Sequence, residues 1–120
     1  MKLGDVVRLE KVFGKMLKIP MTMAKAKKVS KGLKPFFEEI KDFNDVRLKG
    51  AQKYVTKGKD FIGPEDEGFE NFMKELDELV SQEIGLDFDS FDEDDFKDLV
   101  VTPIEMQSIE NIGLFKVKEA

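Results

Sequence analysis

The stretch DFDSFDEDDFKD, residues 87–98, carries seven carboxylates in twelve positions, a density that would suit a calcium loop. An EF-hand loop requires oxygen ligands at positions 1, 3 and 5, a glycine at position 6 and an acid at position 12. Asp87, Asp89 and Asp98 satisfy positions 1, 3 and 12, but Phe91 and Asp92 occupy positions 5 and 6. Without the glycine the loop cannot turn sharply, so the sequence argues against an EF-hand.

The same stretch is better interpreted as the start of a short helix. Ser90 followed by Glu93 has the spacing of a capping box, and acids in the first helical turn are favoured by the helix dipole. Phe88, Phe91 and Phe96 would anchor this acidic turn to a core. If a partner with a basic surface exists, we expect it to contact Asp87, Asp89, Asp92, Glu93, Asp94 and Asp95.

Seven lysines lie between residues 15 and 34, and their charge would attract phosphate. This run contains no arginine and no base-reading pattern, so we expect no sequence-specific binding of nucleic acid. Lys25 and Lys28 are therefore candidate protein-contact residues on the polar side of a helix. Met16, Met21 and Met23 could line a peptide groove or meet a membrane, although core or interface use is commoner.

The chain has no cysteine and no histidine, which removes disulfides, zinc–thiolate sites and the usual general base. Carboxylate pairs such as Glu38 with Glu39, or Glu75 with Glu78, could in principle hold a hard cation. They fall on polar helix faces with no catalytic partner, so we expect no enzyme activity, no cofactor and no metal site. No apolar run is long enough to span a membrane, and the charged first residues do not form a secretory signal.

Charge is strongly segregated along the chain. Residues 1–34 carry a net +8 and residues 64–98 a net −13, within an overall charge of −5. Two interpretations follow: the two segments neutralise each other, within or between copies, or they form two partner surfaces of opposite sign.

Apolar periodicity predicts helices over residues 5–18, 22–55 and 66–83, the second being one long helix or two collinear ones. Asp5 and Thr22 are the expected N-caps of the first two helices, and Pro20 should end the first. Pro35 predicts a kink or short break near residue 34 of the second helix. Arg47 falls on the apolar stripe of that helix, so we expect it to pair with Glu75 or Asn71 of the third helix.

The last third predicts a different architecture. Alternation in residues 83–89 predicts a short strand, residues 98–102 are a second candidate strand, and LFKVK at 114–118 is either a third short strand or a tail. Thr102, Pro103 and Glu105 form a capping box with proline at N1, and the helix that they begin should end at Gly113. We therefore expect a single mainly helical α+β domain over residues 1–120: an amphipathic helical hairpin (1–83) and a small C-terminal β element with short helices (84–120).

Three stretches carry a resemblance: EEIKDFNDVRLKGAQKY (38–54), GFENFMKELDELVSQEIGLDF (68–88) and VTPIEMQSIENI (101–112). Their layout resembles small bacteriophage-encoded proteins without an assigned function, although Pro35 interrupts what is usually a continuous helix. The resemblance implies a phage setting, in the host cytoplasm during infection or in the virion, and supplies no catalytic residues.

From these observations we expect a non-catalytic virion or assembly component that acts through contacts between its charge-segregated surfaces, with homo-oligomers as one outcome. The alternative is an acidic inhibitor or regulator that binds a basic host protein.

Overall fold

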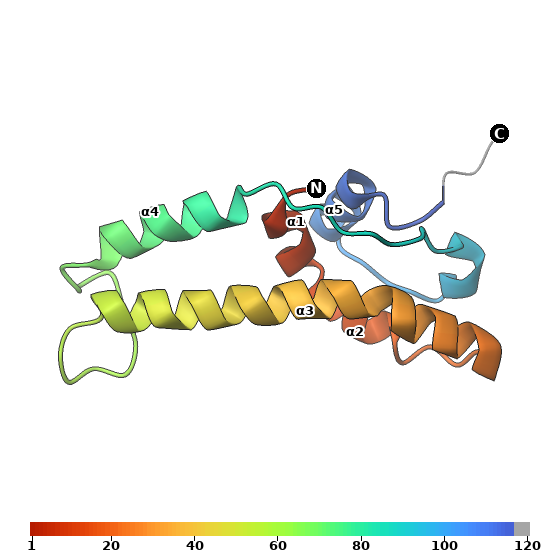
Figure 1. Cartoon of the computed structure of the whole chain (residues 1–120), viewed down its shortest axis with the longest axis horizontal. Coiled ribbons are helices and arrows are strands. Elements are labelled where there is room, and N and C mark those ends of the chain that lie inside the picture. The colour runs from red at the N-terminus through yellow and green to blue at the C-terminus, as the bar shows by residue number, and fades with distance from the viewer. Residues whose placement is uncertain (117–120) are drawn as a thin grey trace.

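The computed structural model describes residues 1–116 and is mainly helical (Figure 1). Its helices are α1 (Leu3–Arg8), α2 (Glu10–Met16), α3 (Met23–Tyr54), α4 (Phe69–Val80), the short 3-10 helix η1 (Glu93–Phe96) and α5 (Pro103–Ile112). No strand forms within residues 1–116, where two isolated bridges, Lys2 with Glu83 and Phe91 with Phe115, are the only β pairings. The prediction of a mainly helical chain is confirmed, and the predicted β element is wrong for the described residues.

The first predicted helix is two helices that meet at Leu9. The Leu9 amide donates to the carbonyl of Val6, three residues back, at 3.1 Å instead of to that of Asp5, four residues back, and the backbone of Leu9 leaves helical geometry. The fully buried Leu9 side chain joins the core at this break. Asp5 does not cap α1, because Lys2 holds the N-cap position and the Asp5 carboxylate contacts α5 instead.

Helix α3 runs from the predicted cap to the predicted end. The Thr22 hydroxyl accepts a hydrogen bond from the Lys25 amide at 3.4 Å, as expected for an N-cap. The helix continues through Pro35, so the predicted break at residue 34 does not occur. Leu33 and Phe36, on either side of Pro35, are fully buried, and Phe36 stacks on Phe13 at 4.8 Å. We attribute the continuity to this packing, which offsets the lost backbone hydrogen bond.

The core lies where α1 and α2 pack on the first half of α3 and α5 packs on α1 (Figure 1). Helix α5 is joined to α1 by a buried polar network around Ser108, whose hydroxyl donates to Asp5 at 2.9 Å and accepts from Arg8 at 3.1 Å. The main core cluster consists of Val6, Leu9, Val12, Phe13, Met16, Val29, Leu33, Phe36, Ile40, Phe96, Ile109, Ile112 and Leu114.

The predicted strand at 83–89 is an extended segment without a neighbouring strand. Ile84, Leu86 and Phe88 do turn toward the core, as the alternation predicted, while Asp87 and Asp89 are exposed. Residues 98–102 lead into α5 without strand structure. In LFKVK, Phe115 forms only the isolated bridge, and residues 117 and 118 lie outside the described residues.

The molecule is elongated, with extents of 53 × 29 × 25 Å and a radius of gyration of 17.1 Å. A compact domain of this length would have a radius of gyration of about 14 Å. The excess comes from an arm that projects from the core: residues 43–54 of α3, the loop 55–68 and α4, which runs back antiparallel to α3 (Figure 1). The predicted third helix, 66–83, is thus confirmed in a shorter form.

Candidate interaction surfaces

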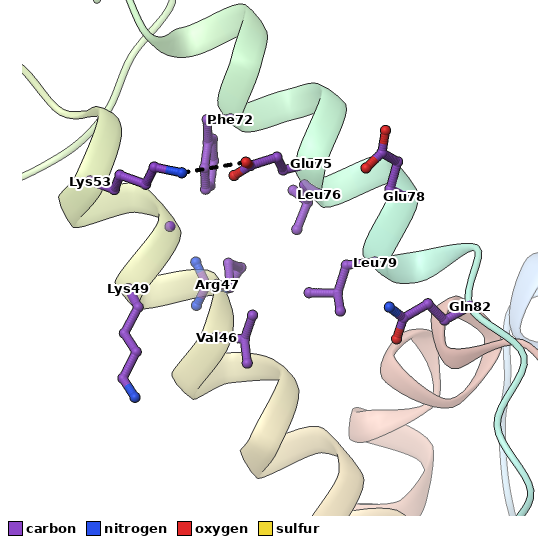
Figure 2. Close-up of a pocket in the computed structure, with 11 residues that line it drawn as sticks. Val46, Arg47, Lys49, Lys53, Phe72, Glu75, Leu76, Glu78, Leu79 and Gln82 are labelled. Carbon is purple, nitrogen blue, oxygen red and sulfur yellow. Dashed lines mark ion pairs between the residues drawn. The ribbon is translucent and has the colours of Figure 1, made fainter.

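A groove of about 410 Å³ lies between α3 and α4 of the arm (Figure 2). Its floor is apolar, formed by Val46 of α3 and by Phe72, Leu76 and Leu79 of α4, with Gly50 leaving bare backbone between them. Amphipathic helices place these residues on one side because they recur every three or four positions. The groove is therefore a shared apolar face of the two helices.

The two walls of this groove carry opposite charge. Arg47, Lys49 and Lys53 come from α3, and Glu75 and Glu78 from α4. Lys53 and Glu75 meet across the groove at 3.6 Å, whereas Lys49 and Glu78 extend from the outer edges (Figure 2). A hydrogen bond with Tyr54 and the charge of Glu75 raise the pKa of Lys53.

Arg47 does not make the predicted pair with Glu75. Glu75 accepts a hydrogen bond from the Tyr54 hydroxyl at 2.9 Å and pairs with Lys53 instead. Asn71 is exposed and does not bond to Arg47 either. Within residues 1–116 the half-buried Arg47 guanidinium has no hydrogen-bond or ion-pair partner and lines the groove.

The arm has very little core of its own. Phe43 and Phe72 are its only buried apolar side chains among the described residues, and both lie outside the main cluster. Val46 is 52% exposed and Met73 37% exposed, although both belong to the apolar stripes of their helices. An amphipathic helix needs a second apolar layer to cover it, and the arm lacks that layer on its groove side.

The two oppositely charged stretches meet at the other end of the molecule, where the acidic turn lies over the start of α3 (Figure 1). A depression of about 730 Å³ is lined there by Lys25, Lys28, Lys31, Asp87, Asp89, Asp92 and Asp95, among others. Lys25 and Asp95 form an ion pair at 2.8 Å, and the hydrogen bond to Asp95 raises the pKa of Lys25. Apart from Lys31, these lining residues are six of the eight predicted contact residues. Their closeness within one protomer supports partial neutralisation of the acidic turn by the lysines of α3.

The predicted cap at Ser90 is wrong. The Ser90 hydroxyl donates to the carbonyl of Gly113 at 2.7 Å, which ties the acidic turn to the end of α5. Asp92 caps η1 instead, because its carboxylate accepts from the Asp94 amide at 3.0 Å. Glu93 and Asp94 lie in the first turn of η1, as expected, with exposed side chains. No group of three or more carboxylates within residues 1–116 is arranged to hold a metal ion.

The predicted capping box at residues 102–105 is confirmed. The Thr102 hydroxyl accepts from the Glu105 amide at 3.2 Å, and the Glu105 carboxylate accepts from the Thr102 amide at 2.8 Å. Pro103 stands at the first helical position, and α5 ends at Gly113 with a left-handed φ of 67°. This box is structural and lies away from the arm groove.

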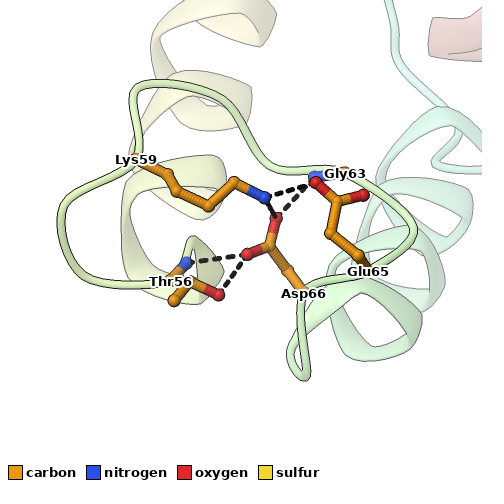
Figure 3. A network of polar contacts seen from close by, with 5 residues as sticks. All are labelled: Thr56, Lys59, Gly63, Glu65 and Asp66. Carbon is orange, nitrogen blue, oxygen red and sulfur yellow. Dashed lines mark hydrogen bonds and ion pairs between the residues drawn. The ribbon is translucent and has the colours of Figure 1, made fainter.

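A buried carboxylate that the sequence analysis missed organises the loop at the tip of the arm (Figure 3). Asp66 accepts hydrogen bonds from the Thr56 hydroxyl, from the Thr56 amide at 3.1 Å and from the Gly63 amide at 2.6 Å. It also pairs with Lys59 at 3.0 Å. These donors, led by the Thr56 hydroxyl and the Gly63 amide, hold the pKa of Asp66 well below its usual range. The available signal was an acid three residues after Gly63, in a turn rich in glycine and proline.

Comparison with protein families, curated proteins and solved structures finds no match for the chain. Among residues 1–116, no helix combines the length and the apolar character needed to cross a bilayer.

Proposed function

We propose that this chain is a non-catalytic protein-interaction module of a bacteriophage particle or of its assembly, and that the arm groove is its main binding surface. The single observation that carries the proposal is the groove itself: an apolar floor of Val46, Phe72, Leu76 and Leu79 in an arm with almost no core. Exposed apolar surface of this kind is favourable to cover with another protein.

The charged walls make a protein partner more suitable than a small apolar ligand. A helical partner can place acids against Arg47 and Lys49 and bases against Glu78 while its apolar side faces the floor. Glu75 is already engaged by Tyr54 and Lys53, which leaves it poorly placed for acid–base chemistry. The phage setting comes from the sequence resemblance, and with it the host cytoplasm or the virion as the place of action.

Site-specific photo-crosslinking tests this function. A benzophenone amino acid at Val46 samples the groove, and the same group at Val100, which is 75% exposed and outside the groove, is the matched control. In infected cells we expect a discrete crosslink from position 46, to this chain or to a phage structural protein, and none of equal yield from position 100. Equal or absent crosslinking at both positions would refute the groove as the binding surface.

The alternative function, an acidic inhibitor of a basic host protein, draws on the exposed carboxylates of the acidic turn. These are Asp87, Asp89, Asp92, Glu93 and Asp94. It is weakened by the Lys25–Asp95 pair, which already places a cation against this turn. This alternative would be favoured over the assembly function if the chain captured one basic host protein stoichiometrically. The capture should be lost when Asp89 and Asp92 are changed to Asn, and it should persist when substitutions block the arm groove.

A further inference from the structure

We propose that the groove is occupied by the groove of a second copy of this chain, so that two arms form an antiparallel four-helix bundle. This inference rests on the proposed function and names the partner. Two αα-hairpins that each lack a second apolar layer can supply it to one another. A two-fold axis running along the arms places α3 of one copy beside α4 of the other, with all neighbouring helices antiparallel.

The charge pattern fits this arrangement. The wall on α3 is basic, with Arg47, Lys49 and Lys53, and the wall on α4 is acidic, with Glu75 and Glu78. A two-fold axis brings the basic wall of each copy to the acidic wall of the other, so the complementarity occurs twice. A groove with walls of one sign would instead repel its own copy.

The register of the hairpin fixes which residues meet. Lys53 lies opposite Glu75 at 3.6 Å. About one helical turn closer to the core, Lys49 of α3 therefore lies at the same height as Glu78 of α4, because the two helices are antiparallel. An axis parallel to the helices preserves height, and both side chains extend from the outer edges of their helices (Figure 2). Lys49 of one copy therefore faces Glu78 of the other.

Two features of the groove are explained by this pairing. Arg47, half-buried and without a partner within residues 1–116, comes within reach of the acidic wall of the second copy. Gly50 carries no side chain beside the Phe72 ring, so it does not block the approach of the facing α4. The interface is short, because twelve helical residues span only about 18 Å, so we expect a dimer of micromolar rather than nanomolar affinity.

Sedimentation velocity over a concentration series, from about 1 to about 500 μM, tests the pairing. We expect the mass to rise from the 13.7 kDa monomer toward twice that value. Lys49→Glu or Glu78→Lys alone should each weaken the dimer at least about tenfold, because symmetry applies every reversal twice. Both residues are exposed, and unchanged helical circular dichroism would verify folding.

The decisive experiment mixes the two charge-reversal variants, Lys49→Glu and Glu78→Lys. At each Lys49–Glu78 contact, a Lys49→Glu homodimer places two acids together and a Glu78→Lys homodimer places two bases together, whereas their heterodimer places an acid against a base at both contacts. An equimolar mixture should therefore form the heterodimer although neither variant dimerises well alone. Lys27→Glu, an exposed lysine of α3 outside the arm, is the control and should leave the dimer unchanged. A monomer at every concentration, or a mixture no more associated than its components, overturns the pairing.

The two proposals fail in different ways. A crosslink from Val46 to another phage protein, together with a strictly monomeric chain, would overturn self-association and retain the interaction function. Both proposals would be overturned if no crosslink formed from Val46 in cells and if Lys49→Glu and Glu78→Lys left the dimer as stable as in the wild type.

Discussion

The buried hydroxyl of Ser108 offers a quantitative test of how the two ends of the chain are held together. Ser108 is fully buried, donates to Asp5 at 2.9 Å and accepts from Arg8 at 3.1 Å. Ser108→Ala removes both hydrogen bonds. Arg8 is nearly half exposed and can turn to water, so the main loss is the bond to the Asp5 carboxylate.

A hydrogen bond to a charged group contributes about 1.5–3 kcal/mol, and we take about 2 kcal/mol because Asn111 still lies 3.4 Å from Asp5. Replacing serine by alanine inside a helix returns about 0.5 kcal/mol through helix propensity. Ser108→Ala should therefore lower the free energy of unfolding by about 1.5 kcal/mol. Ser30, exposed in the interior of α3, is the matched control, and Ser30→Ala should raise stability by about 0.5 kcal/mol.

Urea unfolding followed by circular dichroism measures both changes, at a protein concentration low enough to keep the chain monomeric. The free energies of unfolding of Ser108→Ala and Ser30→Ala should differ by about 2 kcal/mol, which corresponds to a difference of about 1 M between their urea midpoints. Equal shifts of the urea midpoint in Ser108→Ala and Ser30→Ala would show that the buried hydroxyl contributes no more than an exposed one. A double-mutant cycle with Asp5→Ala should also give a coupling above about 1 kcal/mol, since the two side chains share one bond.

Three further predictions concern caps, glycines and pH. Thr102→Ala removes the acceptor for the Glu105 amide and should cost about 1 kcal/mol in the urea midpoint analysis; an unchanged midpoint would contradict the cap. Gly14→Ala meets open space in α2 and should stabilise by about 0.5–1 kcal/mol, whereas Gly113→Ala, at φ 67°, should destabilise by about 1 kcal/mol; the same sign for both would count against this. The lowered pKa of Asp66 means that its contribution is complete above the ordinary aspartate value of about 4 and is lost as pH falls below it. Acid titration should therefore show a stability gap between wild type and Asp66→Asn that is full at neutral pH and narrows below about pH 4; a gap independent of pH would refute the assignment.

Local signals predicted the helices well because their causes are local. The apolar stripe of α3, the hydroxyl of Thr22 and the box at residues 102–105 each act through groups within one helical turn, so their spacing in the sequence is sufficient. The end of α5 at Gly113 followed for the same reason.

The predictions of side-chain partners were wrong where a group distant in sequence bonded to the same atoms. Ser90 had the spacing of a cap, but the carbonyl of Gly113 takes its hydroxyl, and Asp92 caps η1 instead. Asp5 was drawn from its expected cap by Ser108, which is more than a hundred residues away in sequence. Glu75 was expected to pair with Arg47, but Tyr54 and Lys53 lie closer once α4 is in register with α3.

The missing strands have a similar cause. Alternation at 83–89 correctly placed Ile84, Leu86 and Phe88 toward the core, yet a strand also needs a neighbour with which to form a ladder. Within residues 1–116, the backbone of this segment pairs only with the first residues of the chain: the Ile84 amide donates to the Met1 carbonyl at 2.7 Å, and Lys2 with Glu83 forms one isolated bridge. Alternation reports which side of a segment is buried and says nothing about its neighbours.

The sequence by itself determined that the chain is mainly helical, that it lacks the histidine and cysteine on which much enzyme chemistry depends, and that its charges are segregated. Only the tertiary structure decided how those charges are used. It folds part of the acidic turn onto the lysines of α3, so those charges partly neutralise each other, and it leaves the arm groove between a basic and an acidic wall. The physical reason is that charge and periodicity are properties of single segments, whereas neutralisation and grooves exist only between segments that the fold brings together.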